Sequence, residues 1–324
     1  MITILIPDKN PRTRRRTVTG LLLGLTIVLA ACGSPGTGGA DDLTIVATTS
    51  IWGDVVSQLV GDDAEVEVLI PRGSDPHDYQ TSSSQVATLH AADLVIANGL
   101  GLEEGLHDVL ESAKSDGVAV FEVGPLLDPL PFSGEDDHEG DEESEESHDE
   151  DPHVWLDPQR VSTAADFIAQ RLAEIEPSVD WQARANEYVA ELEQTDSQIA
   201  TTLAAVPDSD RKLVTNHDAL GYFADRYGFE VIGVVIPGGS TLSDPSSAAL
   251  AALVAEIEHE GVHAIFAETT QPTRLAEAVA AEVGSDVSVV ELYTGSLGEP
   301  GSGAETLVGM LLTDTTLIAD ALAR

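Results

Sequence analysis

Residues 181–206 read WQARANEYVAELEQTDSQIATTLAAV, and this stretch decides how the chain is organised. With Thr195 filling one slot, its apolar side chains recur every three or four residues: Trp181, Ala185, Tyr188, Leu192, Ile199, Leu203 and Val206. That period is typical of a single amphipathic helix. No glycine or proline interrupts the stretch before Pro207, so a helix over it would be about 38 Å long at about 1.5 Å per residue. We expect a rigid linker helix within residues 177–206, poorly suited to act as a hinge.

Short β-branched runs alternate with helical patterns on both sides of this helix. The runs before it are residues 43–48, 64–70, 93–97 and 118–123, and those after it are residues 212–215, 230–235, 263–267 and 287–292. Strands that alternate with helices predict a parallel, doubly wound sheet. The sequence therefore predicts an α/β fold with two doubly wound (βα)4-type lobes, residues 43–176 and 207–324, joined by the linker helix.

Residues 1–31 have the features of a signal peptide. Arg12 and three arginines at 14–16 precede the apolar run GLLLGLTIVL at 20–29, which is too short for a stable membrane span. The following Leu-Ala-Ala-Cys resembles a bacterial lipobox, so we expect cleavage before Cys32, the only cysteine, and lipidation of that residue. The paired arginines leave twin-arginine export open as a route. Residues 32–42 would then form a flexible tether to a lipid anchor on the outer face of the cell membrane, the periplasmic side where an outer membrane is present.

The chain is strongly acidic. Its formal charge is −42, from 57 Asp and Glu against 15 Lys and Arg. This balance excludes nucleic-acid binding, which needs basic side chains to contact phosphates, and indicates either a cation-handling role or adaptation to high salt. Twelve of the acidic residues lie in the segment 134–151, together with His138 and His148. Such a run is usually a solvated loop, although it could also recruit weakly bound cations.

Three of the nine histidines share a setting. His77 follows the expected strand that ends at Ile70, His153 follows the acidic segment, and His217 follows the expected strand 212–215. Ligands of open α/β sheets bind beyond the carboxyl ends of strands, so these histidines from two lobes would meet in a cleft between them. Neutral imidazole is a preferred ligand of zinc and its neighbours. The pattern therefore predicts a metal site in that cleft.

The residues around these histidines resemble the motifs of a known family. The motifs are GSDPH at 73–77, HVWLDP at 153–158, NHDALGY at 216–222 and IFAE at 265–268. They are similar to those of the solute-binding lipoproteins of zinc and manganese ABC transporters, over nearly all of the chain after residue 42. The resemblance implies that a metal ion is bound between two lobes by His77, His153 and His217 and is handed to a membrane permease. It also accounts for the acidic segment, because the zinc-preferring branch carries such a loop before its second metal histidine.

One position departs from the family pattern. Many relatives have a metal-binding aspartate in a Thr-Asp-Ser stretch near the C-terminus, where this chain has Thr-Gly-Ser at 294–296. The fourth ligand would then be Glu268 or a water molecule, and Glu268 could instead hydrogen-bond a ligand histidine. Manganese-preferring relatives usually carry a carboxylate where this chain has His217, and nitrogen-rich sites of low coordination number suit zinc. We expect Zn²⁺ in preference to Mn²⁺, with His77, His153, His217 and Glu268 as its ligands.

Two other functions compete with metal transport. A zinc hydrolase could use the three histidines with Glu268 as general base. We expect His259 and His263 to flank a turn between a helix and a strand, so the chain shows no His-Glu-x-x-His helix. A surface adhesin lipoprotein with a vestigial cleft is the other alternative. The sequence favours an exported, monomeric binding protein that is not an enzyme and whose partner is an ABC permease.

Overall fold

A computed structural model describes residues 43–132, 150–284 and 286–323. The expected signal peptide, Cys32, the tether and most of the acidic segment, with His138 and His148, lie outside the described residues. Within the described ranges, no helix is both long enough and apolar enough to cross a membrane.

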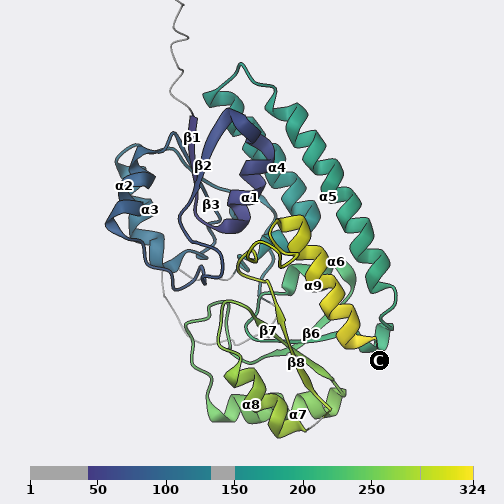
Figure 1. Ribbon diagram of the computed structural model, residues 1–324. Helices are drawn as coiled ribbons and strands as arrows, with labels where there is room; N and C mark the ends of the chain where they lie inside the picture. The colour runs from purple at the N-terminus through teal and green to yellow at the C-terminus, as the bar shows by residue number, and fades with distance from the viewer. Residues whose placement is uncertain (1–42, 133–149, 285, 324) are drawn as a thin grey trace, which may run out of the picture. The chain divides into compact units, whose positions relative to one another are not determined.

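Two parallel four-stranded sheets form the centres of two lobes (Figure 1). The first sheet contains β1 (Leu43–Ala47), β2 (Ala64–Val68), β3 (Leu94–Ala97) and β4 (Val120–Glu122), in the order β2-β1-β3-β4. The second contains β5 (Lys212–Thr215), β6 (Glu230–Val234), β7 (Ala264–Glu268) and β8 (Ser288–Leu292), in the order β6-β5-β7-β8. The predicted α/β fold is confirmed, and each predicted strand forms within two residues of its expected bounds.

Helices cover the two sheets. The first lobe contains α1 (Ser50–Val60), α2 (Ser83–Ala91), α3 (His107–Ser115) and α4 (Pro158–Ile175), and α6 (Gly221–Tyr227), α7 (Ser247–Glu260), α8 (Arg274–Val283) and α9 (Leu307–Leu322) follow in the second half of the chain. Several of these helices begin at residues whose side chains cap the helix N-terminus. Ser82 and Gln85 form a capping box at α2, and the Asp157 side chain accepts from the amide of Gln159, with Pro158 in the first turn of α4.

The long helix α5 spans Trp181–Leu203, about 35 Å at about 1.5 Å per residue. It begins at the N-cap Asp180 and ends shortly before Pro207. Its buried positions are those that the period predicts: Trp181, Ala185, Tyr188, Leu192, Thr195, Ile199 and Leu203. The helix packs along α4 and α1 from the first half of the chain and along α9 from the second (Figure 1).

One hydrophobic core runs through both lobes by way of this helix. It contains Ile45 and Trp52 from the first lobe, Leu192 from α5, and Phe266 and Met310 from the second half of the chain. Since the same cluster continues on both sides of α5, a movement of this helix against either lobe would expose buried apolar surface. Helix α5 is therefore fixed to both lobes and serves as a stiff support.

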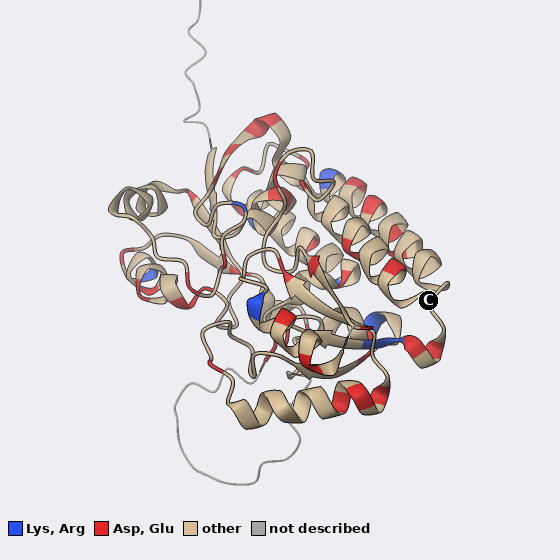
Figure 2. Cartoon of the chain, turned by 60° about the horizontal axis from the view of Figure 1, so that its bottom comes forward, with Lys and Arg blue, Asp and Glu red and all other residues tan. Residues whose placement is uncertain are grey.

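The few basic residues are used to hold elements together. Figure 2 shows Asp and Glu on many elements and Lys and Arg at few places. Arg226 of α6 forms ion pairs with Asp196 of α5 and with Asp157 at the start of α4. Arg211 donates to the carbonyl oxygens of Leu203 and Val206 at the end of α5. With 57 acidic residues and 15 basic ones, most carboxylates cannot have a basic partner, and the surface repels itself.

We expect the stability of this fold to rise with ionic strength. The Debye length falls from about 10 Å at about 0.1 M salt to about 3 Å at about 1 M, which weakens repulsion between exposed carboxylates. The urea midpoint of the metal-free protein, measured in increasing NaCl, should therefore increase. A variant with Asp62, Glu65 and Glu67, all exposed on the first lobe, changed to their amides should show a smaller increase. An equal increase in both proteins would mean that the salt acts by another route than charge screening.

Candidate metal centre

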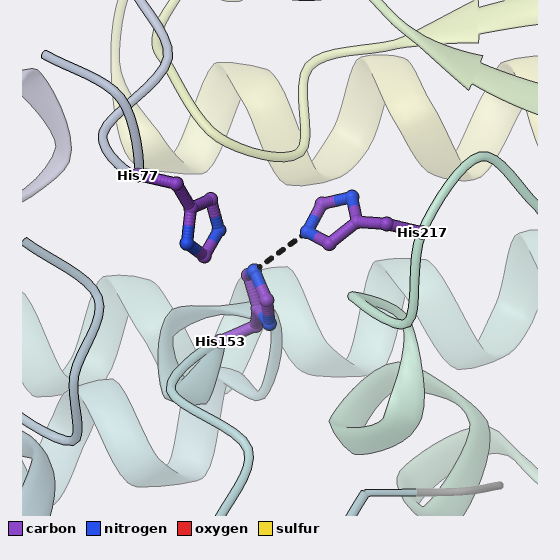
Figure 3. Close-up of side chains that lie close together, drawn as sticks. All are labelled: His77, His153 and His217. Carbon is purple, nitrogen blue, oxygen red and sulfur yellow. Dashed lines mark hydrogen bonds between the residues drawn. The ribbon is translucent and has the colours of Figure 1, made fainter. Parts of the chain in front are cut away.

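The three predicted histidines meet, although they come from distant segments. His77 lies in the loop after β2, His153 directly precedes the 3-10 helix η4 (Val154–Leu156), and His217 follows β5. Figure 3 shows their rings turned toward a common point. Ring centroids are 5.5 Å apart for His77 and His153, 5.3 Å for His77 and His217, and 4.9 Å for His153 and His217. Each residue offers a ring nitrogen, and these nitrogens all lie within 4.8 Å of one another.

Burial sets the charge of these imidazoles. The sequence predicts these histidines in a cleft. In the structure the protein encloses them, and their exposed fractions are 2% for His77, 1% for His153 and 1% for His217. Burial, reinforced by the neighbouring imidazoles, lowers the pKa of His77 and the pKa of His153 well below the ordinary value for histidine. Both rings are therefore held neutral, which is the form that binds a metal ion.

His153 is oriented by Asp151. Its Nδ1 lies 2.7 Å from Asp151 Oδ1, which also accepts from the backbone amide of His153 at 2.9 Å. When Nδ1 donates its proton to this carboxylate, Nε2 keeps a lone pair that points to the common centre. Burial raises the pKa of Asp151 to about 8, against the lowering effect of the His153 amide.

Asp151 is the residue at which the structure differs most from the expected solvated loop over 134–151. It is fully buried, its amide donates to Leu130 O at 2.7 Å, and its carbonyl accepts from the Tyr222 hydroxyl at 2.6 Å. An isolated antiparallel bridge between Pro131 and Glu150 brings the two ends of the segment together. Asp151 therefore lies in the candidate metal centre beside His153, and sequence reasoning missed it because it ends a run of acidic residues.

His217 is oriented in the same way by Glu268, at the end of β7. Its Nδ1 hydrogen-bonds Glu268 Oε1. Burial alone would lower the pKa of His217, but the carboxylate of Glu268 outweighs it and raises that pKa. Burial alone would raise the pKa of Glu268, and His217 lowers it instead. The two residues form a buried ion pair or share one proton.

The nitrogens that face the centre are close enough to share a proton in a hydrogen bond or to bind one metal ion. His217 Nε2 lies 3.1 Å from His153 Nε2 (Figure 3). Two lone pairs repel each other at this distance, so a proton or a metal ion must lie between these atoms. Zinc bonds of about 2.0–2.1 Å in tetrahedral geometry place ligand nitrogens about 3.3 Å apart. The observed spacing is thus close to that of a tetrahedral metal site.

His77 differs from the other two histidines. Among the described residues, neither of its buried ring nitrogens has a hydrogen-bond partner. Glu104 Oε1 lies 3.8 Å from its Nδ1, beyond hydrogen-bond range. A buried polar nitrogen without a partner is costly, and a bond to a metal ion would satisfy it.

The position of Glu268 bears on the fourth ligand. Its Oε1 bonds Nδ1 of His217, the nitrogen that does not face His153, and the group of mutually close ligand atoms consists of the three histidines. This geometry favours the alternative in which Glu268 orients a ligand histidine over the one in which it binds the metal directly.

Gly295 lies beside the loop that carries His77. A methyl group added at Gly295 would lie 3.4 Å from Pro76 Cδ and 3.7 Å from Thr270 Oγ1, which are ordinary contacts. The preceding residue, Thr294, contacts the first lobe, because its carbonyl accepts a hydrogen bond from Trp155 Nε1 at 2.9 Å. A Cβ atom therefore fits at position 295, next to the residue that precedes His77.

A second histidine-containing motif does not form a site of the hydrolase type. Residues 259–263 read HEGVH, but α7 ends at Glu260, and Gly261 follows in the left-handed conformation with φ 66°. His259 and His263 are thus not on one face of a helix, as a hydrolase of that type requires. Glu256, His259 and Glu260 do lie close together at the surface, but Glu260 already pairs with Lys212.

Comparison with known proteins identifies the family. Residues 45–321 match the family model described as ZnuA, zinc-uptake complex component A, periplasmic. The chain belongs to this family. It is 31% identical over 296 residues to the manganese-binding lipoprotein MntA of Halalkalibacterium halodurans, covering 90% of this chain and 93% of that protein. It is also 31% identical over 313 residues to the zinc-binding protein TroA of Treponema pallidum, covering 94% of this chain and 96% of that protein.

The solved structures agree with the sequence comparison. The periplasmic zinc-binding protein TroA from Treponema pallidum superimposes with a TM-score of 0.77 at 29% identity, covering 87% of this chain and 100% of that chain. As a ZnuA-family member, the protein is a metal-binding component of an ABC uptake system and is not an enzyme. Its relatives are named as a manganese-binding lipoprotein, a zinc-binding protein and an iron ABC transporter substrate-binding lipoprotein, so membership of the ZnuA family does not decide the metal. The hydrolase and adhesin alternatives find no support in these relatives.

The supporting role of the two carboxylates can be tested by changing them to amides. Asp151→Asn and Glu268→Gln should each weaken metal binding by on the order of 10- to 100-fold, because the ring nitrogen loses its charged acceptor. Competition titration against a chelating dye would measure the affinity, with Glu104→Gln as a control that removes a nearby charge without a ring hydrogen bond. A loss in Glu268→Gln as large as that in His217→Ala would instead identify Glu268 as a direct ligand.

Proposed function

We propose that this protein captures Zn²⁺, in preference to Mn²⁺, through His77, His153 and His217, and delivers it to an ABC permease. The observation that carries the proposal is the convergence of three buried imidazoles, two of which face each other at 3.1 Å with their Nδ1 atoms held by carboxylates. Zinc favours nitrogen donors in sites of low coordination number, whereas manganese favours oxygen donors in octahedral array. Three nitrogens with a fourth position open to water suit zinc.

Charge compensation supports three neutral ligands. A buried divalent ion needs negative charge nearby, because ionic charge is costly at low dielectric. Glu268, and Asp151 once the ion has displaced its proton, supply it through their hydrogen bonds to His217 and His153. The ion can therefore be stabilised without a carboxylate in direct contact, and Glu268 need not turn away from His217 to bind it.

We further propose that the protein acts as a monomer outside the cell membrane, anchored through a lipid on Cys32. The Leu-Ala-Ala-Cys motif at 29–32 supports this, and the MntA relatives of Halalkalibacterium halodurans and Bacillus subtilis are named lipoproteins. An anchor and a tether over residues 32–42 would keep the metal-loaded protein close to its permease.

Alanine substitutions test the ligand set. His77→Ala, His153→Ala and His217→Ala should each lower zinc affinity by more than about 100-fold, beyond the loss expected for a supporting carboxylate. Affinity should also fall as the pH is lowered, because protons compete with the metal for the same nitrogens. Calorimetric titration at several pH values would measure both effects, with exposed His107→Ala as the control. The ligand assignment is wrong if two of the three variants bind zinc as the wild type does.

Restoring a carboxylate at position 295 tests the choice of metal. Gly295→Asp would place an anionic oxygen donor beside Pro76 and should raise the affinity for manganese relative to zinc. The dissociation constants of both metals should be compared with those of Gly295→Asn, which has the same shape without the charge. A metal preference equal in all three proteins would show that a side chain at position 295 does not reach the ion.

A further inference from the structure

The tripeptide Asp-Pro-His occurs twice in the chain, at 75–77 and at 151–153, and each copy ends in a predicted ligand. In both copies the aspartate Oδ1 accepts from the backbone amide of the histidine, at 3.0 Å for Asp75 and 2.9 Å for Asp151. This local turn is a common use of aspartate. The two carboxylates differ in what else they bind.

Asp151 bonds the ring of its own histidine, whereas Asp75 reaches into the second lobe. Asp75 Oδ2 accepts from Thr241 Oγ1 at 2.5 Å and from Gln271 Nε2. Thr241 lies in the loop between β6 and α7, and Gln271 lies in the turn after β7. Asp75 is only 5% exposed, so these hydrogen bonds to its carboxylate are shielded from water.

These bonds connect the ligands of the two lobes. The backbone N–H of Gln271 donates to the backbone carbonyl of Glu268 at 3.2 Å, and the side-chain carboxylate of Glu268 hydrogen-bonds His217. A chain of hydrogen bonds therefore leads from the His77 amide through Asp75 and Gln271 to the residue that orients His217.

Another link from the same loop reaches a different part of the protein. Arg72 donates to the carbonyls of Gly298 and Glu305. That segment is itself tied to α1 of the first lobe, because the amide of Leu307 donates to Asp54 Oδ2 at 2.8 Å. The bonds of Asp75 differ in that they join the His77 loop to the turn after β7 and the loop after β6, and so to the second sheet.

We propose that Asp75 is a positioning residue that latches the His77 loop to the second lobe and thereby sets how slowly the metal leaves. The inference rests on the proposed function, since it concerns the same site. Withdrawal of His77 from the centre requires that the bonds of Asp75 to Thr241 and Gln271 break. Their loss should therefore appear in the rate of metal dissociation, with little change in the rate of association.

The experiment changes the partners of Asp75 and leaves the His77 loop intact. Zinc-loaded mature protein is mixed with excess chelator, and the release rate is measured by stopped flow for Thr241→Val and Gln271→Met, which keep shape but remove the donors. Each should release zinc on the order of 10-fold faster than wild type, as expected for a lost hydrogen bond to a charged group. Asp75→Asn should also release faster, because its amide keeps the turn to His77 but loses the charge.

Two controls separate the latch from general effects. Asp78→Asn removes the same charge from an exposed position of the same loop, and Thr241→Ser keeps the hydroxyl donor, so both should release zinc at the wild-type rate. The double variant Thr241→Val with Asp75→Asn should be less than additive, since both changes remove one interaction.

The outcomes distinguish the latch from the proposed function. Wild-type release rates in Thr241→Val and Gln271→Met, with zinc still bound, would overturn the latch and leave the proposed function standing. A smaller fraction of zinc-binding protein with an unchanged release rate would show a merely structural role and also overturn it. Failure of the wild type to bind zinc or manganese in the preceding titration would overturn both.

Discussion

Two imidazole nitrogens, Nε2 of His153 and Nε2 of His217, face each other at 3.1 Å inside the protein, and this pair needs a proton or a metal ion between its atoms. The requirement constrains everything around it. Each ring must be turned the right way, which the buried carboxylates of Asp151 and Glu268 do by bonding the opposite nitrogen. The two rings also come from different lobes, so the lobes must be held at a fixed separation.

Helix α5 and its packing provide that fixed separation. A core that continues from Trp52 of α1 through Leu192 of α5 to Met310 of α9 resists movement of either lobe against the helix. The few basic residues also resist this movement, because the ion pairs of Arg226 join α6 to α5 and to the start of α4. In a chain with 57 acidic and 15 basic residues, placing arginines at helix junctions holds elements together where repulsion would otherwise separate them.

Much of this arrangement could be predicted from the sequence because its signals are local. The period of residues 181–206 predicts helix α5 with its buried positions, and the settings of His77, His153 and His217 bring the three ligands together. The roles of carboxylates could not be predicted in the same way, because they depend on contacts between distant segments. Glu268 is expected as a metal ligand, with a hydrogen bond to a ligand histidine as the alternative, and only the fold shows that it bonds Nδ1 of His217. The repeated Asp-Pro-His tripeptide was the one local signal that could have pointed to Asp75 and Asp151.

Three buried carboxyl groups near the centre differ in their surroundings, and together they bear on how a divalent ion can be favoured. Burial raises the pKa of Asp151 to about 8, Glu268 pairs with His217, and Asp75 accepts from Thr241 and Gln271. A metal ion entering the site competes with the protons held by Asp151 and by the pair of His217 and Glu268. A doubly charged ion gains twice the Coulomb energy of a singly charged one from the same carboxylates, at equal distances. The carboxylates thus offset part of the larger dehydration cost of a divalent ion, and the imidazole nitrogens, which zinc and its neighbours prefer as ligands, supply the selectivity over sodium and potassium.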